Sequence, residues 1–235
     1  NKLKPDEKYN TRKVPTISFI RKIVKSQKIT GVCNFRAVFK TIKKSRARIL
    51  IKIADGFLKY KALLPDHFSQ HIRGCNEPII VISLSLLFEY LGGHANLLII
   101  NKKKKEVERF EPHGELGGPD GDIIDSIIRT VVLGALKGYR YITPLDYCPR
   151  VGPQTFAMRT AKTSKSVYTK KARKLVKRKK IEFCTMWSIL YGHLRILEWS
   201  LPRETVMEQM FKLLEIPYFI QKYSTYVKKT LKSRK

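Results

Sequence analysis

The stretch Phe183-Cys184-Thr185-Met186-Trp187 opens the most apolar helical segment of the chain, which runs to Trp199. A helix of this composition is typical of the centre of a fold, because it has little polar surface to turn toward water. A cysteine at the start of a helix lies beside unpaired backbone N–H groups and the positive end of the helix dipole, and both stabilise a thiolate. Cys184 is therefore a candidate nucleophile, with a buried structural cysteine as the alternative.

The segment upstream of this helix predicts a sheet. A β-branched run after Pro78 suits a strand that is buried on both faces. Two further runs flank a charged turn, which is the pattern of a hairpin. The expected strands are 79–82, 94–100, 107–110 and 139–142, and a helix is expected over 122–138. We therefore expect an α+β fold whose mixed sheet, over residues 79–142, packs on the Cys184 helix.

Apolar residues at helical or strand spacing predict further elements outside this sheet. We expect two short basic helices between Ile17 and Lys44, a strand at 49–53, a helix from Pro65 with Phe68 and Ile72 on one face, and a helix over 203–214. The expected domains are a basic, mostly helical N-terminal region at 1–75 and a main domain at 76–235, which carries a basic insertion at 155–181.

Charge is the outlier of the composition. The 235 residues carry 48 Lys and Arg against 19 Asp and Glu, a formal net charge of +29. Such an excess of one sign repels itself in a compact fold, so we expect it to serve a polyanion. Nucleic acid is the first candidate, and an anionic membrane surface or an acidic protein is the second. The longest apolar run, at 79–88, is half of the about 20 residues that a membrane span requires, so no transmembrane segment is expected and the protein should be soluble.

The basic insertion concentrates this charge. Eleven Lys and Arg and no acidic residue lie between Arg159 and Lys180, and a second basic cluster occupies 228–235. Because no regular aromatic residues lie between them, these cations suit the phosphate backbone rather than the bases. We expect non-specific nucleic-acid binding by eight residues of the insertion, which are Lys170, Lys171, Arg173, Lys174, Lys177, Arg178, Lys179 and Lys180.

The four cysteines, which form no CxxC pair, are Cys33, Cys75, Cys148 and Cys184. No secretory signal is visible, so free thiols in a reducing compartment are favoured over a disulfide framework. His67 and His71 have the spacing of a metal-binding helix face, but a solvated helix face is the favoured interpretation. No metal and no cofactor is expected.

A lone histidine and a carboxylate precede the candidate nucleophile in the order that a thiol hydrolase can use. His94 follows two glycines at the start of an expected strand, and Glu111 lies 17 residues further on, at the far end of the paired strand. His94 would act as the base, and Glu111 would fix the tautomer of its imidazole. Asn96, on the same strand face as His94, is the alternative orienting group. Gln154 follows a Gly-Pro step and is either an oxyanion donor or a turn residue.

Four short motifs around these residues resemble one family. They are Gly93-His94-Ala95-Asn96-Leu97, the segment 107–114 with its Phe-Glu-Pro step, Gly152-Pro153-Gln154, and Phe183-Cys184-Thr185-Met186-Trp187. They look like the adenovirus-type (adenain) and SUMO-protease superfamily of cysteine peptidases, and most of all like its members in large DNA viruses. The resemblance covers residues 78–200 in pieces. It implies a papain-like fold in circularly permuted order, with a mixed central sheet and a central helix that bears the cysteine.

The resemblance also implies roles and a function. His94 would be the general base, Glu111 its orienter, Cys184 the nucleophile and Gln154 the oxyanion donor. The protein would be a viral cysteine peptidase that cleaves virion precursor proteins, or ubiquitin-like conjugates, in association with nucleic acid. Its partners would be viral precursor or capsid proteins, in the virion and at cytoplasmic assembly sites of the infected host cell.

Two alternatives from other functional classes stay open. The first is a structural virion protein, a minor capsid or DNA-associated component, that keeps the same fold without catalysis. The second is a nucleic-acid-binding module with no catalytic role, in which the ordered set of His, Glu, Gln and Cys is a coincidence.

Overall fold

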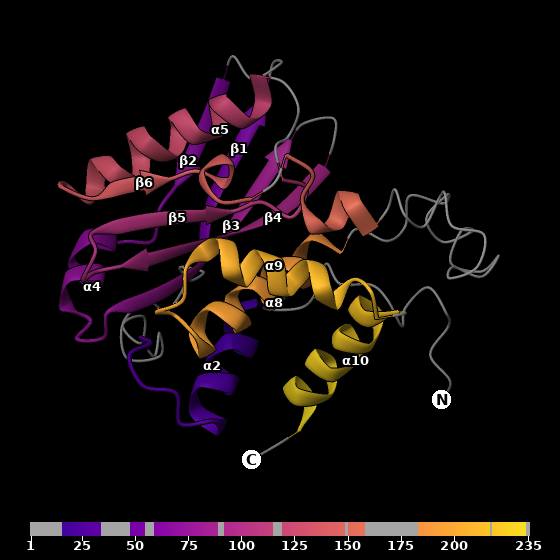
Figure 1. The fold of residues 1–235 in the computed structure, drawn as a ribbon. Helices are drawn as coiled ribbons and strands as arrows, with labels where there is room; N and C mark the ends of the chain where they lie inside the picture. Colours follow the sequence, from indigo (N-terminus) through magenta and orange to yellow (C-terminus); the bar gives the residue numbers. More distant parts are fainter. Residues whose placement is uncertain are drawn as a thin grey trace.

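A computed structural model describes residues 16–33, 48–54, 59–88, 92–114, 119–148, 150–157, 183–216 and 218–233. These residues form three layers, in which one six-stranded sheet lies between two layers of helices (Figure 1). The fold is therefore α+β with a mixed sheet, as the sequence predicts.

The strands follow the sheet order β2-β1-β3-β4-β5-β6. Their bounds are Arg48–Ala54 (β1), Lys59–Leu63 (β2), Ile79–Phe88 (β3), Gly92–Asn101 (β4), Glu106–Phe110 (β5) and Arg140–Ile142 (β6). The pairs β1–β3 and β5–β6 are parallel, and the other neighbours are antiparallel. The β-branched run at 79–82 is buried throughout, because β3 lies in the middle of the sheet and is covered on both faces.

Strands β4 and β5 form the predicted hairpin, which is confirmed. A turn at 102–105 joins them, and the side chain of Asn101 accepts a hydrogen bond of 3.0 Å from the backbone N–H of Lys104. The register places Leu97 opposite Phe110. One step further along the same register, Glu111 follows β5 beside Asn96, so the hairpin determines which polar side chains meet at this end of the sheet.

Helices cover both faces of the sheet. On one face lie α2 (Thr16–Ser26), α8 (Cys184–Leu197), α9 (Arg203–Leu213) and α10 (Phe219–Lys232), which share one apolar core. On the other face lie α4 (Phe68–Gly74) and α5 (Pro119–Ile128). Helix α5 continues as a π-helical turn at Arg129–Leu133, and α4, α5 and this turn share a second apolar core. The predicted helices at 184–199 and 203–214 and the helix carrying Phe68 and Ile72 are confirmed.

Helix α8 is the central helix that its composition predicts. It packs on β4 and also contacts α2, α9 and α10, and Trp187 and Tyr191 are fully enclosed. A Cβ atom at Gly192 would lie 2.8 Å from the side chain of Leu97, so the Leu97 side chain would have to shift if α8 kept this close approach to β4 with a larger residue there. The Ser188 hydroxyl donates a hydrogen bond of 3.1 Å to the carbonyl of Ala95 and fixes the first turn of α8 along the strand.

Strand β2 and helix α10 are among the elements that the sequence-based prediction lacks. Strand β2 pairs with β1 at the edge of the sheet, and α10 runs into the basic cluster expected at 228–235. Both β1 and β2 precede residue 75 but belong to the same sheet as β3, so the described part of the N-terminal region is mixed rather than mostly helical. The first expected basic helix is α2, whereas most of the second lies outside the described residues.

The expectation that all four cysteines are free thiols is wrong. Cys33 and Cys75 form a disulfide with a Cα–Cα distance of 6.4 Å, and Cys148 and Cys184 are free. The backbone N–H of Cys33 donates a hydrogen bond of 2.7 Å to the carbonyl of Ile79, which draws the segment after α2 against the start of β3. Cysteines that are 42 residues apart in sequence therefore meet through strand pairing, which spacing alone does not reveal.

We expect replacement of both Cys33 and Cys75 by serine to lower the free energy of unfolding. A cross-link that closes a 42-residue loop contributes about 4 kcal/mol by restricting the unfolded chain. Urea unfolding of both proteins without reductant measures the difference. Peptide mapping of the oxidised protein should find the two cysteine peptides as one mass, and four titratable thiols in that sample would contradict the disulfide.

Candidate active site

The structure brings together three of the four residues that the sequence nominates for catalysis. His94 lies on β4, Glu111 directly follows β5, and Cys184 is the first residue of α8. The hairpin aligns His94 with Glu111, and the packing of α8 on β4 carries Cys184 to the same end of the sheet. The three side chains come from segments that are far apart in the chain.

Glu111 holds the His94 ring through one of its carboxylate oxygens. His94 Nε2 lies 2.6 Å from Glu111 Oε1, which also accepts a hydrogen bond of 3.0 Å from the backbone N–H of His113. Glu111 Oε2 accepts a hydrogen bond of 2.8 Å from the amide of Asn96. Of the two orienting groups considered from the sequence, Glu111 contacts the ring, and Asn96 contacts Glu111.

The Cys184 side chain is close to the same imidazole and acts on it as a hydrogen-bond partner and through its charge. Because Nε2 is engaged by Glu111, Nδ1 is the ring nitrogen left for the sulfur. Cys184 begins α8, where the backbone N–H groups of the first turn have no acceptor within the helix. A carboxylate, an imidazole and a thiol thus follow one another in contact. In this arrangement the carboxylate orients the imidazole, and the imidazole can act as the base for the thiol.

The electrostatic environment of His94 and Glu111 favours the charged forms of both side chains. Burial alone would lower the pKa of His94, but the adjacent Glu111 carboxylate and the Cys184 sulfur outweigh it and raise that pKa to about 10. Burial would raise the pKa of Glu111, but the charge and hydrogen bond of His94 and the nearby Arg109 guanidinium lower it to about 2. At neutral pH the ring is therefore cationic and the carboxyl group anionic.

A buried polar network lies behind Glu111. Arg109 donates a hydrogen bond of 3.0 Å to the side-chain oxygen of Asn96, and it also lies 3.6 Å from Glu111. On its other side, Arg109 bonds Asp125 at 2.8 Å and the Tyr141 hydroxyl at 3.0 Å. Tyr141 donates to Asp125 in turn, at 2.6 Å. Arg109 thus holds Asn96 and Glu111 against a fixed acidic partner on α5.

Gln154 lies in a short helical turn at 153–157 that packs against the segment after Glu111. Its backbone N–H donates to the carbonyl of Pro112 at 2.9 Å, and its side chain is 3% exposed with an unpartnered Oε1. A Cβ atom at Gly152 would meet the backbone of Gly114 at 2.2 Å, so only glycine fits there. The structure therefore places Gln154 beside the segment that follows Glu111, with a buried side-chain oxygen that lacks a partner.

His113 is a polar side chain of this region that the sequence analysis did not single out. Its ring centroid lies 5.2 Å from that of His94, and its Nδ1 lies 2.9 Å from the hydroxyl of Thr155. Arg109, Asp125 and Tyr141 were missed as well. Charged residues on a strand are usually exposed, and only the burial of all five residues of β5 shows that Arg109 is not.

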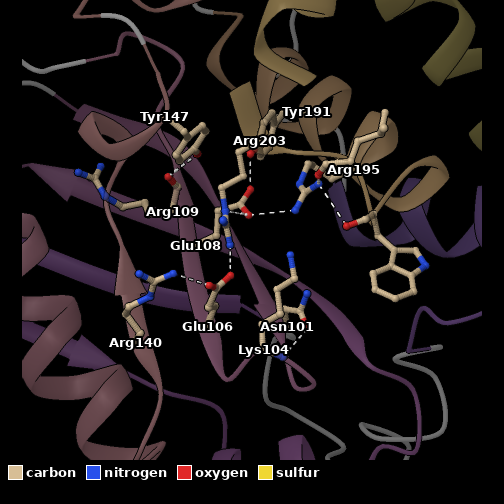
Figure 2. A network of polar contacts seen from close by, with 12 residues as sticks. Asn101, Lys104, Glu106, Glu108, Arg109, Arg140, Tyr147, Tyr191, Arg195 and Arg203 are labelled. Carbon is tan, nitrogen blue, oxygen red and sulfur yellow. Dashed lines mark hydrogen bonds and ion pairs between the residues drawn. The ribbon is translucent and has the colours of Figure 1, made fainter. Parts of the chain in front are cut away.

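A second buried network holds α8 and α9 against β5 (Figure 2). Glu108 accepts hydrogen bonds from Arg195 of α8 at 3.2 Å, from Arg203 of α9 at 2.6 Å, and from the hydroxyl of Tyr191. Glu106 lies next along the strand face and binds Arg140 at 2.7 Å and Arg203. Because these contacts tie α8 to the strand that leads into Glu111, they help to set the position of Cys184.

Replacing Glu108 by glutamine is expected to lower the free energy of unfolding by about 3–5 kcal/mol, because Arg195 would remain buried without its charged partner. Urea unfolding measures this change. Glu208→Gln, on the exposed face of α9, is the matched control and should change stability by less than about 0.5 kcal/mol. Equal effects of the two substitutions would show that the Glu108 contacts contribute nothing to the fold.

The expected nucleic-acid-binding residues at 170–180 lie outside the described part of the chain. Within residues that the structure does describe, no group of three His, Cys, Asp or Glu side chains is arranged to hold a metal ion. The helices among those same residues are too short or too polar to cross a membrane.

Comparison with known proteins does not support the family suggested by the motifs. No protein-family model matches the chain. A protein of Acanthamoeba polyphaga mimivirus, named as an ankyrin repeat protein, is 24% identical over 204 residues, which is 80% of this chain. The chain spans about a quarter of the length of that relative, 25%. The expected membership in the adenain and SUMO-protease superfamily is therefore wrong, since motifs of three to eight residues are too short to establish descent.

The ankyrin name of the relative does not describe the fold seen here. Ankyrin repeats are stacked helix pairs with a period of about 33 residues. The described residues of this chain instead form a mixed sheet between two helical layers.

Proposed function

We propose that the protein is a thiol-dependent acyl hydrolase, of the cysteine peptidase type. The single observation that carries the proposal is the contact series from Glu111 through His94 to Cys184. A structural cysteine needs only apolar neighbours, and a structural histidine needs only a hydrogen-bond partner. A cysteine at a helix start, beside an imidazole that a carboxylate orients, is the arrangement required for a nucleophile and its acid–base partner.

The chemistry follows from the charges of the site. With the pKa of His94 raised to about 10, the ring is an imidazolium at neutral pH, and its positive charge stabilises the negative charge of the Cys184 sulfur as it attacks. The sulfur attacks the acyl carbon, and the imidazolium gives its proton to the leaving amine, so that a thioester remains on Cys184. The neutral ring then takes a proton from water, which attacks the thioester and releases the acid. Glu111 keeps the ring oriented through both steps.

Two groups are suited to stabilise the oxyanion. The backbone N–H of Cys184 belongs to the first turn of α8 and has no helical acceptor of its own. The side-chain amide of Gln154, which is buried and can donate through its Nε2 hydrogens, is the second candidate. A papain-like arrangement of helix and sheet, in permuted chain order, is the finer structural part of the proposal.

The proposed substrates are proteins, and the proposed setting is viral. A peptide bond of a virion precursor, or the isopeptide bond of a ubiquitin-like conjugate, fits the acyl-transfer chemistry. The mimivirus relative supports a viral setting, in the virion or at assembly sites in an infected cell. The net charge of +29 supports an association with nucleic acid through its phosphates.

One observation favours a structural virion protein as the second candidate. Cys184 is 7% exposed, which is little for a nucleophile that must meet a polypeptide. A protein that keeps the three contacts only for stability would retain the fold and the charge without hydrolysis.

Digestion of a peptide library derived from a proteome separates the two candidates. The proposal expects new peptide termini that share a sequence preference, together with a mass increase on Cys184 when the reaction is quenched with acid. No cleavage of any peptide, with nucleic acid present or absent, would support the structural candidate and overturn the enzymatic one.

A further inference from the structure

Helices α2 and α10 lie side by side in the helical layer that also contains α8 and α9 (Figure 1). The charged residues of these two helices are all lysine or arginine. The Phe19 ring of α2 meets Tyr226 of α10 edge-on, with 6.0 Å between the ring centroids. Lys22 Nζ reaches across to Ser233 at the end of α10, where it bonds the hydroxyl at 3.1 Å and also the carbonyl oxygen. Neither helix contains an aspartate or a glutamate.

The apolar faces of both helices are already used by the fold. The first helix buries Phe19, Ile20, Ile23 and Val24, and the second buries Ile220, Tyr223 and Val227. These side chains belong to one core with α8 and α9. What the pair of helices presents to solvent is therefore their charged side.

The exposed cations of α10 lie along one stripe. Lys222, Lys229 and Lys232 are exposed, and their spacing of seven and three residues keeps them near one face of the helix. The stripe is about 15 Å long, from ten residues at the helical rise. Tyr226 lies within it and is 43% exposed. Lys25, on α2, and Lys28, just beyond that helix, add exposed charge.

The lysines of this surface are close enough for the charge of one to disfavour the charged form of another. Partial burial and the charge of Lys232 lower the pKa of Lys228. The neighbouring helix α9 differs, because its exposed residues include Glu204, Glu208 and Lys212. Helix α9 thus mixes charges of both signs, whereas the charged residues of α2 and α10 are all positive. A surface whose charges repel one another is stabilised when an anion binds it.

We propose that the exposed surface of α2 and α10, with Lys25, Lys28, Lys222, Lys229 and Lys232, binds the phosphate backbone of double-stranded nucleic acid. Lysine contacts neutralise phosphates and read no base, so binding is independent of sequence. An amphipathic helix binds a membrane by inserting its apolar face, and here both apolar faces are buried in the core. The inference rests on the proposed association with nucleic acid, but not on the chemistry of Cys184.

The test uses the full chain, a fluorescent 20-base-pair DNA duplex, and anisotropy titrations at several salt concentrations. The surface variant combines Lys25→Gln, Lys222→Gln, Lys229→Gln and Lys232→Gln. The control variant removes the same number of exposed charges elsewhere and combines Lys52→Gln, Lys61→Gln, Lys104→Gln and Lys137→Gln. Each phosphate contact contributes about 0.9 to the slope of log affinity against log salt.

The surface variant should reduce this slope by about 3 and weaken binding at least about tenfold at 0.1 M salt, whereas the control should change the slope by less than about 1. Equal changes in both variants would overturn the assignment to α2 and α10. Loss of binding only on deletion of the insertion 155–181 would also overturn it, but would leave the association with nucleic acid standing. A surface variant that loses binding to anionic phospholipid vesicles but keeps DNA affinity would assign the surface to a membrane instead.

Discussion

Replacing Cys184 by alanine is expected to abolish acyl hydrolysis while the fold remains. Removal of the nucleophile from a catalytic triad costs at least about 10⁴-fold in rate, because no other group can form the covalent intermediate. Cys184 is small, lies at the start of α8 and ties no other element by its side chain apart from His94, so the change in stability should be minor. The assay is peptide hydrolysis, with circular dichroism and urea unfolding as checks on the fold.

Cys148→Ala is the matched control. Cys148 is the other free cysteine and is equally buried, but burial and the nearby Glu111 carboxylate raise the pKa of its thiol to about 12. A thiol with this pKa is protonated at neutral pH and is a poor nucleophile. Hydrolysis should therefore survive Cys148→Ala. Equal loss in the two variants would mean that Cys184 is not the nucleophile.

Replacing Glu111 by glutamine is expected to lower hydrolysis by about 10²- to 10⁴-fold, which is the usual contribution of an oriented acid–base group. Glutamine keeps the size of the side chain and removes the negative charge beside the ring. The contributions of Glu111 that raise the pKa of His94 are then lost, so this pKa falls from about 10 and the cationic ring is less favoured beside the sulfur. Asn96→Ala should have a smaller effect, because Asn96 contacts Glu111 and not the ring.

The pH dependence of the free energy of unfolding is a second measurement of the Glu111–His94 ion pair. The folded pKa of His94 is raised, so its contribution is complete below its usual value of 6.5 and is lost as the pH rises through about 10. The folded pKa of Glu111 is lowered, so its contribution is complete above about 4.5 and is lost as the pH falls toward about 2. In Glu111→Gln the loss of stability that Glu111 causes at acid pH should vanish. The loss that His94 causes at alkaline pH should begin at a lower pH. An unchanged pH profile, measured by urea unfolding and by NMR titration of the histidine rings, would contradict the ion pair.

The elements that the sequence predicts correctly are those with a periodic apolar pattern and clear ends. The run at 79–82, the hairpin around the lysine turn and the helix from Cys184 all have such patterns, and each appears in the structure. Strand β2, with the sequence Lys-Tyr-Lys-Ala-Leu, is almost wholly exposed at the sheet edge and therefore shows no buried alternation. Helix α10 has a buried face with helical spacing, but only the basic cluster at 228–235, which overlaps its end, stands out in the sequence.

The candidate site could be predicted as a set of residues and not as a geometry. The order of His94, Glu111 and Cys184 is visible in the chain, but their contact depends on the register of β4 with β5 and on the approach of α8 at Gly192. Arg109 escaped prediction because its burial depends on partners from α5 and β6, which no local pattern indicates. The family assignment failed for a related reason, since short motifs preserve residue types without the intervening fold.

The rate of alkylation by iodoacetamide at Cys184 and Cys148, followed by mass spectrometry from pH 5 to 9, tests the central claim most directly. The His94 imidazolium beside the sulfur should make Cys184 react at pH 6 at least about 100-fold faster than Cys148, whose thiol pKa is raised to about 12. In His94→Ala this advantage of Cys184 over Cys148 should shrink. A Cys184 that reacts no faster than Cys148, or that is indifferent to His94, would contradict the proposed active site.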